Sequence, residues 1–368
     1  MNQAQIEIQL VAALVAAACA LPGVFLVLRR VALMSDAISH TVLLGIVVGY
    51  MLLRDVDNPL LILFAAGAGV LTVTLSELLL RTGRVREDAA IGLVFPALFS
   101  IAIIIITRDF SGIHLDVDAV LLGELAFAPF NRAELLGANL PRGAWVMGAI
   151  LLANLALILL FYKELKLATF DAALASALGF APAVIHYVLM ASVSVTVVGA
   201  FDHVGSILVI ALMIAPAAAA YLLTDRLSRM LILSVAIAVA SAISGYWVSR
   251  WLNVNISGAM ASMTGVFFVL ALVFAPERGL VARAVQRTRR RQRFAVDMLL
   301  VHLIRHQNTA QEATENTVPH LTTELNWTPA FAEAAVERAA QQGWIRRQMD
   351  RLYLTEQGQQ VVAQVLRR

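Results

Sequence analysis

The chain has 368 residues, of which 60% are apolar and 14% are charged, and its mean hydropathy is +0.78. This composition excludes a pair of ordinary soluble domains and indicates a protein that lies mostly in a membrane. The formal net charge of +3 is unevenly spread, because residues 1–276 carry −2 and residues 277–368 carry +5. A single cysteine, Cys19, excludes a disulfide framework and a cysteine-based metal cluster within one chain.

Nine apolar segments have roughly the 17–22 residues that cross a ~30 Å hydrocarbon core. We therefore predict an all-α polytopic membrane bundle of about eight or nine helices over residues 1–276. The first segment lacks the basic start and cleavage motif of a secretory signal, so we expect it to be retained as a helix. The segments are residues 8–28, 37–53, 59–80, 89–106, 144–162, 182–200, 204–223, 229–249 and 257–275.

Basic residues in the short connections predict the orientation of the bundle. One set of connections is richer and leads into the basic tail: Arg29, Arg30, Arg81, Arg84, Arg86, Lys163, Lys166, Arg226 and Arg229. The other set is poorer: Arg54, Arg108, Arg132, Arg142 and Arg250. We expect the richer set and the C-terminus to face the cytoplasm, and with nine helices the N-terminus lies outside.

Two connections are longer than a turn. The outer connection, residues 107–143, has room for a short surface helix around Asp116 to Ala126. In the inner connection, residues 163–181, Asp171 can cap a short amphipathic helix that stops at Gly179. A helix across the cytoplasmic mouth of a bundle is a natural contact for a partner protein.

Asp36 and His40 are the strongest candidates for an ion site. They stand four residues apart, so they share one face of a helix. A carboxylate and an imidazole inside a span are costly unless they are paired or functional. Together they suit Mn(II), Fe(II) or Zn(II), and two copies of the bundle would double the set to four ligands. The alternative is a hydrogen bond that only orients the end of the helix.

Other polar residues are weaker candidates. Asp202 and His203 lie at an outer connection, where they would attract cations or dock a binding protein; ordinary solvated charge is the alternative. The same holds for His114, Asp116 and Asp118, whereas Glu77 and His186 are interpreted as interfacial anchors. No glycine-rich phosphate loop is present in the sequence, so we do not expect this chain to hydrolyse ATP.

Four stretches occur in the order and spacing of one transporter family: residues 32–45, 86–92, 169–179 and 204–218. The first reads Ala-Leu-Met-Ser-Asp-Ala-Ile-Ser-His-Thr-Val-Leu-Leu-Gly and the last contains Ile-Ala-Pro-Ala-Ala. They resemble the permease subunits of ATP-binding-cassette importers for manganese, zinc or iron. This sequence departs from the family's pattern by a serine at Ser35, where glycine is frequent, and a leucine at Leu44, where proline is frequent.

The resemblance implies a role for several residues. It places Asp36 and His40 in the metal path. Independently of the resemblance, Pro216 inside an apolar segment is expected to kink its helix, either for a moving gate or for packing alone. The resemblance makes the inner helix, marked by Phe170, Asp171, Leu178 and Gly179, the segment that couples to a separate ATPase subunit; an amphipathic helix that only covers the membrane interface is the alternative. It also implies an extracytoplasmic metal-binding protein, a second permease copy or sister permease, an inner-membrane location, and Mn(II), Zn(II) or Fe(II) as cargo without a permanently bound cofactor.

The tail changes composition after Pro276. Residues 277–318 are predicted to form a basic juxtamembrane helix and a polar linker, whose arginines can bind anionic lipid. In residues 319–368 we predict a helix from Pro319, a second capped by Thr328 and ended by Gly343, two strands around Met349, and a last helix after Thr355.

That order of elements resembles the winged-helix domain of iron-dependent repressors. The expected recognition helix, residues 328–342, holds Glu333 and Glu337 but a single arginine, Arg338. A face so poor in basic residues binds phosphate badly, so we expect regulation or protein docking and no nucleic-acid partner.

Two other functions remain open for the whole chain. One is a transporter driven by an ion gradient, in which Asp36 and His40 exchange protons. The other is a membrane-tethered regulator that only senses metal. A siderophore or cobalamin permease fits the architecture, but such permeases usually lack the Asp36 and His40 pair and have longer bundles.

Overall fold

The computed structural model describes residues 2–55, 58, 60–109, 123, 125–135, 137–309 and 312–366. The chain divides into two compact units, Met1–Gly279 and Leu280–Arg368. Each unit is described by itself. Most of the predicted outer helix around Asp116 lies outside the described residues, as do His114 and Asp118.

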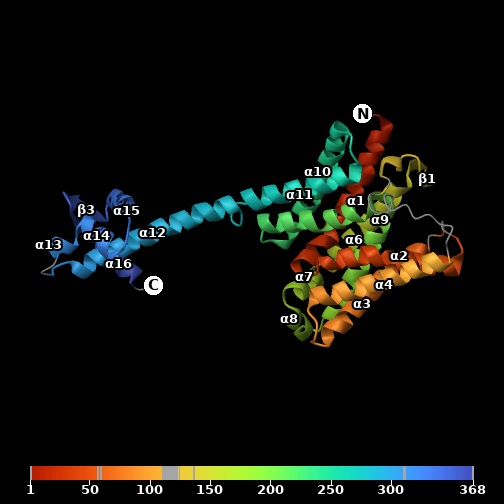
Figure 1. The fold of residues 1–368 in the computed structure, drawn as a ribbon, viewed down its shortest axis with the longest axis horizontal. Coiled ribbons are helices and arrows are strands. Elements are labelled where there is room, and N and C mark those ends of the chain that lie inside the picture. Colours follow the sequence, from red (N-terminus) through yellow and green to blue (C-terminus); the bar gives the residue numbers. More distant parts are fainter. Residues whose placement is uncertain are drawn as a thin grey trace. The chain divides into compact units, whose positions relative to one another are not determined.

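The first unit is a bundle of long apolar helices (Figure 1). Eight helices in the described part of the chain are long and apolar enough to cross a membrane, which confirms a polytopic bundle. They are α1 (Gln3–Leu28), α2 (Leu33–Leu53), α3 (Leu61–Arg81), α4 (Glu87–Asp109), α6 (Arg142–Leu160), α9 (Pro182–Leu223), α10 (Leu227–Leu252) and α11 (Ile256–Phe274). Shorter elements connect them: η1 (Leu125–Phe127), β1 (Arg132–Leu135), β2 (Ala138–Pro141), α7 (Tyr162–Phe170) and α8 (Ala172–Ala177).

Helix α1 lies at the centre of this bundle, where it contacts α6, α9 and α10. Its residues Val15–Ala20 are at most 8% exposed, so this stretch is apolar on every side. Small residues allow the close packing: a Cβ built on Gly23 would lie 2.0 Å from the carbonyl oxygen of Met213. In a lipid solvent such backbone approach stabilises helix pairs through packing, because apolar burial alone gives no advantage over lipid.

Helix α9 reverses direction at Gly205. Near its start, His186 contacts Arg29 at the C-terminal end of α1. Near its middle, His203 packs with Val11 around Gly143, close to the opposite end of α1. Further on, Met213 is back beside Gly23. Gly205 is the non-helical residue inside α9 (φ 74°, ψ 167°), so the two apolar segments predicted as separate spans are two helices joined at one glycine.

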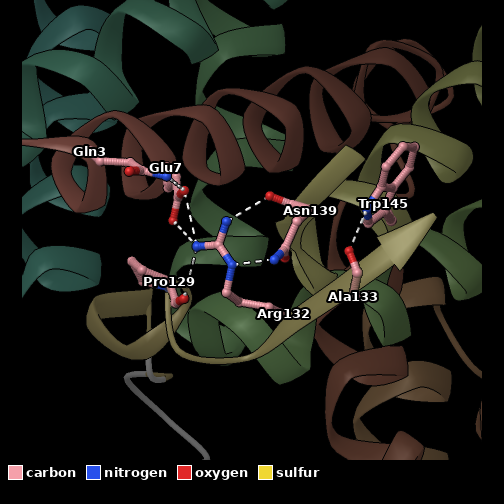
Figure 2. Close-up of polar contacts among 7 residues, drawn as sticks. All are labelled: Gln3, Glu7, Pro129, Arg132, Ala133, Asn139 and Trp145. Atoms are coloured by element: carbon pink, nitrogen blue, oxygen red, sulfur yellow. Dashed lines mark hydrogen bonds and ion pairs between the residues drawn. The ribbon is translucent and has the colours of Figure 1, made fainter. Parts of the chain in front are cut away.

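A buried ion pair fastens the β1–β2 hairpin to α1 (Figure 2). The Glu7 side chain is only 8% exposed, and Nη1 of Arg132 donates to its two carboxylate oxygens at 3.1 and 2.9 Å. The same guanidinium donates to the side chain and backbone of Asn139 across the hairpin. In Figure 1 this hairpin and the N-terminus lie at one end of the unit, and α7 and α8 lie at the other.

Replacement of Arg132 by alanine is expected to lower the free energy of unfolding by about 2 kcal/mol, because it leaves the Glu7 carboxylate buried without its counter-ion; the value allows for the partial exposure of Arg132. The measurement is thermal unfolding of the purified protein in detergent. Arg108→Ala serves as the control, since Arg108 is 85% exposed and pairs with its neighbour Asp109. An equal loss in both variants would contradict the structural role of the pair.

The second unit is a small α+β domain built on a long helix. Its elements are α12 (Leu280–His306), α13 (Glu312–Glu315), α14 (Val318–Glu324), α15 (Pro329–Gln341), β3 (Ile345–Gln348), β4 (Arg351–Leu354) and α16 (Glu356–Val365). Strands β3 and β4 form an antiparallel hairpin with Ile345 opposite Leu354. Leu299, Leu321, Val336, Leu352 and Val362, from five of these elements, share one buried core.

The element boundaries in this unit agree closely with those expected from the sequence. Thr355 caps α16 by accepting from the Gly358 amide at 3.1 Å, and Gly343, with φ 73°, follows α15. Thr328 occupies the cap position of α15 but forms no capping hydrogen bond through its side chain. The basic juxtamembrane segment is helical as predicted, since α12 runs unbroken from Leu280 to His306.

Histidine burial makes this unit sensitive to acid. His302 is 7% exposed and its ring lies 4.6 Å from that of His306 and 5.6 Å from that of His320. Burial, with help from the two neighbouring imidazoles, lowers the pKa of His302, while the Glu315 carbonyl and the Glu324 charge oppose the shift. His306 also contacts the Glu315 carboxylate.

Because the unfolded chain binds a proton at His302 more readily than the folded one, we expect the stability of this unit to fall as the pH drops below about 6.5, the usual histidine value, until the lowered pKa is passed. Hydrogen exchange of the α12 and α14 amides in the full-length protein, measured between pH 7.5 and 5, tests this. His302→Gln should flatten the dependence. An unchanged dependence in that variant would rule out His302 as its source.

Candidate metal path and coupling segment

Asp36 and His40 lie together on α2. His40 Nε2 is 3.4 Å from Asp36 Oδ1, and the two side chains are 35% and 39% exposed, respectively. Asp36 stands in the first turn of α2, where the helix dipole favours a carboxylate. The spacing therefore produces the expected pairing, and both side chains keep access to a ligand.

Two aromatic rings of α4 cover His40. The His40 ring stacks on Phe95 with centroids 5.5 Å apart and an interplanar angle of 23°, and it meets the edge of Phe99 at 5.9 Å. Aromatic packing fixes the plane of the imidazole and limits the directions from which an ion can reach it. These phenylalanines could not be predicted from the sequence, since nothing in their spacing along α4 relates them to α2.

Helix α2 is held rigidly against α3 beside this pair. The Thr72 hydroxyl donates to the Thr41 hydroxyl at 2.7 Å, in a buried contact one residue beyond His40. A Cβ on Gly45 would lie 2.3 Å from the Phe64 carbonyl oxygen, so only glycine permits this approach of the helices. The hydroxyl of Ser39 is satisfied within the helix by the Ser35 carbonyl, at 2.9 Å. These contacts position Asp36 and His40 on a fixed surface.

A single chain brings two candidate ligands together at this place. Over the described ranges, no group of three or more His, Cys, Asp or Glu side chains is arranged to hold a metal ion. One carboxylate oxygen and one imidazole nitrogen suit a borderline divalent ion, with the other positions left to water or to further protein groups.

The short helix α8 has an exposed apolar face. The Asp171 side chain caps it by accepting from the Leu174 amide at 2.9 Å, and Gly179, at φ 85°, ends it. The Phe180 amide then bonds back to the Ala175 carbonyl at 3.0 Å, which completes a Schellman ending. Leu174 on this helix and Leu178 at its C-terminal cap are 46% and 60% exposed, and Phe170, the last residue of α7, is 60% exposed.

The other candidate residues lie apart from the Asp36 and His40 pair. His203 packs near Val11, close to the N-terminal end of α1, whereas α2 begins just after the C-terminal end of that helix. Asp202 beside it is exposed. Pro216 is buried within the second half of α9, eleven residues beyond the glycine at which the helix breaks. Glu77 and His186, expected to be interfacial anchors, contact each other at 2.7 Å.

Comparisons with known proteins agree with this arrangement. Residues 2–275 match the model of the ABC 3 transport family. The zinc transport system membrane protein TroD of Treponema pallidum is 46% identical over 96% of this chain and 96% of its own length. The manganese transport system membrane protein MntD of Bacillus subtilis is 46% identical over 74% of this chain and 92% of its own length.

A solved structure is similar as well. PsaBC from Streptococcus pneumoniae in complex with Fab shares 27% identity and a TM-score of 0.63, over 76% of this chain and 94% of the matched chain. The family match covers most of the first unit, and the alignment with TroD extends through most of the second. The chain is therefore a multi-pass membrane protein that belongs to the ABC 3 transport family of metal permeases.

Proposed function

We propose that this chain is the membrane subunit of an ATP-binding-cassette importer that carries Mn(II), Zn(II) or Fe(II) into the cytoplasm. The observation that carries the proposal is the Asp36 and His40 pair on α2, whose side chains are partly exposed within a helical bundle of this family. The ion passes this pair as substrate. Two bundles related by a two-fold axis would bring together two aspartates and two histidines, enough to replace most of the water around a divalent ion.

The second part of the proposal assigns α8 to an ATPase partner. Leu174 on α8, Leu178 at its C-terminal cap and Phe170 at the end of α7 are exposed and form the apolar ridge that we assign to a groove on another protein. Both ends of the helix are fixed, by the Asp171 cap and the Gly179 turn, so a push on the ridge moves the segment as one body. ATP binding would then rock the bundles between outward-open and inward-open forms.

The third part concerns location and the remaining partners. The protein lies in the cell membrane with α7, α8 and the C-terminus in the cytoplasm, as the distribution of basic residues indicates. The opposite end, with the β1–β2 hairpin, Asp202 and His203, faces an extracytoplasmic metal-binding protein. The exposed arginines of α12 gain from contact with anionic lipid.

For the second unit we propose a winged-helix-like regulatory or protein-docking domain. Helices α14 and α15 followed by the β3–β4 hairpin and α16 support that description. The hairpin residue Arg347 donates to both carboxylate oxygens of Glu333 on α15, at 2.6 and 3.1 Å. Because the Arg347 guanidinium is paired with Glu333, it is less able to bind a phosphate, which argues against a nucleic-acid partner.

Radiometal uptake into proteoliposomes tests the function. The vesicles contain the permease, its ATPase and the binding protein, and ATP is placed on the ATPase side. We expect uptake that stops when the catalytic glutamate of the ATPase is replaced. Uptake that persists under a proton gradient alone would support the gradient-driven alternative, and metal-dependent DNA binding by the full-length protein without uptake would support the regulator.

A further inference from the structure

Arg29 links the α7–α8 segment to the start of the helix that carries Asp36 and His40. It stands in the short turn between α1 and α2, four residues before α2 begins. Its Nε donates to the hydroxyl of Thr169 at 3.1 Å. Thr169 lies on α7, two residues before the Asp171 cap of α8. One hydrogen bond therefore joins the coupling segment to the end of α1 and to the turn that leads into α2, although the two residues are 140 apart in sequence.

The same guanidinium reaches a second group on α9. Arg29 Nη1 lies 3.2 Å from His186 Nδ1. A guanidinium can only donate hydrogen bonds, so Nδ1 must accept and the ring proton must be on Nε2. That nitrogen lies 2.7 Å from Glu77 Oε1. The imidazole is thus held between a cation on the α1–α2 turn and a carboxylate on α3.

Glu77 completes the connection through its other oxygen. Tyr187 donates its hydroxyl to Glu77 Oε2 at 2.7 Å, and Arg81 lies 3.9 Å from the same atom. The side chains of Glu77 and His186 are about one-fifth exposed, at 22% and 20%. Burial also lowers the pKa of Arg29 from its usual value, as expected for a cation largely withdrawn from water. Partial burial makes these contacts stronger and more directional than surface pairs.

Packing alone gives a less direct route from α8 to the ion site. Of the long helices that α8 contacts, α9 is the main one, and α9 in turn packs on α2 and α3. Apolar contacts of this kind allow sliding, whereas the Arg29 fork has two donors in fixed directions. A movement of α7 must either carry the α1–α2 turn with it or break the bond to Thr169.

We propose that Arg29 is a positioning residue that transmits movement of the α7–α8 segment to α2, and that Thr169 is its contact on the coupling side. Glu77 and His186 hold the guanidinium in register with α3 and α9 during this movement. The inference rests on the proposed function, because it assigns a role within the ATP-driven transport cycle.

The test is the coupling ratio, defined as metal ions moved per ATP hydrolysed, in proteoliposomes that contain the complete importer. Thr169→Val removes the hydroxyl that Arg29 reaches and keeps the shape of the side chain, whereas Thr169→Ser keeps the hydroxyl. We expect Thr169→Val to lower the ratio about tenfold, since a hydrogen bond to a charged group is lost. Thr169→Ser should stay within about twofold of wild type, and the KM for metal should be unchanged in both variants.

Arg29→Lys is the second variant, because lysine keeps the charge but cannot reach Thr169 and His186 with two fixed donors. It should lower the ratio as well. Thr82→Val and Arg84→Ala are the matched controls, since both side chains are exposed at the same end of the bundle. We expect wild-type coupling in both.

Two results would overturn the inference. One is a wild-type coupling ratio in Thr169→Val. The other is a parallel loss of ATP hydrolysis, uptake and folded protein in Thr169→Val and Thr169→Ser alike, which would mean that the site only supports folding. Asp36→Asn in the same vesicles separates this from the proposed function: if it abolishes uptake while Thr169→Val keeps full coupling, the inference about Arg29 fails and the metal path stands.

Discussion

Asp36→Asn and His40→Gln are each expected to lower metal uptake by about 100-fold or more. Loss of a residue that only supports a metal ligand already costs about 10- to 100-fold, so loss of a ligand should cost at least as much. Both replacements keep the size and hydrogen-bonding capacity of the side chain. Asn loses the charge that offsets the dehydration of a divalent ion, and Gln loses the imidazole nitrogen. The measurement is ATP-driven radiometal uptake in proteoliposomes, normalised to the amount of folded permease.

Ser39→Ala is the control for these two variants. Ser39 lies between them on α2, is 2% exposed, and donates its hydroxyl to the Ser35 carbonyl of its own helix. It should retain uptake close to wild type. Uptake by Asp36→Asn equal to that by Ser39→Ala would support the alternative in which the Asp36 and His40 pair merely orients the end of the helix.

Gly205→Ala is expected to reduce the stability of the permease by about 3 kcal/mol, because φ 74° with ψ 167° is a backbone region that is almost restricted to glycine. Gly123, from a distant part of the sequence, packs directly against this turn. A Cβ on Gly123 would lie 2.3 Å from the Gly205 amide nitrogen, so the contact has no room for a side chain. A loss of this size at the reversal of α9 should lower both the thermal midpoint and the yield of folded protein. Thermal unfolding in detergent measures the first, and gel filtration the second.

Gly265→Ala is the matched control for the glycine prediction. Gly265 lies inside α11, and a Cβ added there meets nothing within 4 Å. Alanine at this helical position should therefore be neutral or slightly stabilising. If Gly205→Ala were as stable as Gly265→Ala, α9 would not require a left-handed residue at its reversal.

Much of the membrane bundle could be predicted from the sequence because span length is dictated by the thickness of the bilayer. Each predicted apolar segment corresponds to a helix or to half of one. The reversal of α9 was not expected to occur at a single residue, since backbone dihedrals at Gly205 depend on the contacts of α1 and of Gly123. The β1–β2 hairpin was missed as well. Its stability comes from the buried Glu7 and Arg132 pair, whose members are 125 residues apart.

In the candidate site too, local features could be predicted from the sequence, whereas contacts between distant segments could not. Asp36 and His40 could be paired from their spacing, because four residues make one helical turn. The cap at Asp171 and the turn at Gly179 are also local, and both were predicted. By contrast, the rings of Phe95 and Phe99 come from another helix. The contact of Arg29 with Thr169 depends on the three-dimensional arrangement of α1 and α7, so no sequence pattern could reveal it.

X-ray absorption of the metal-loaded importer tests the central claim most directly. The complex is loaded with Zn(II), arrested with a catalytically inactive ATPase, and separated from free metal. We expect imidazole nitrogen at about 2.0–2.1 Å and carboxylate oxygen at about 2.0–2.2 Å around the retained zinc. The imidazole signal should disappear in His40→Gln and remain in Ser39→Ala. Retained zinc whose coordination is the same in wild type and His40→Gln would contradict the assignment of the metal path to Asp36 and His40.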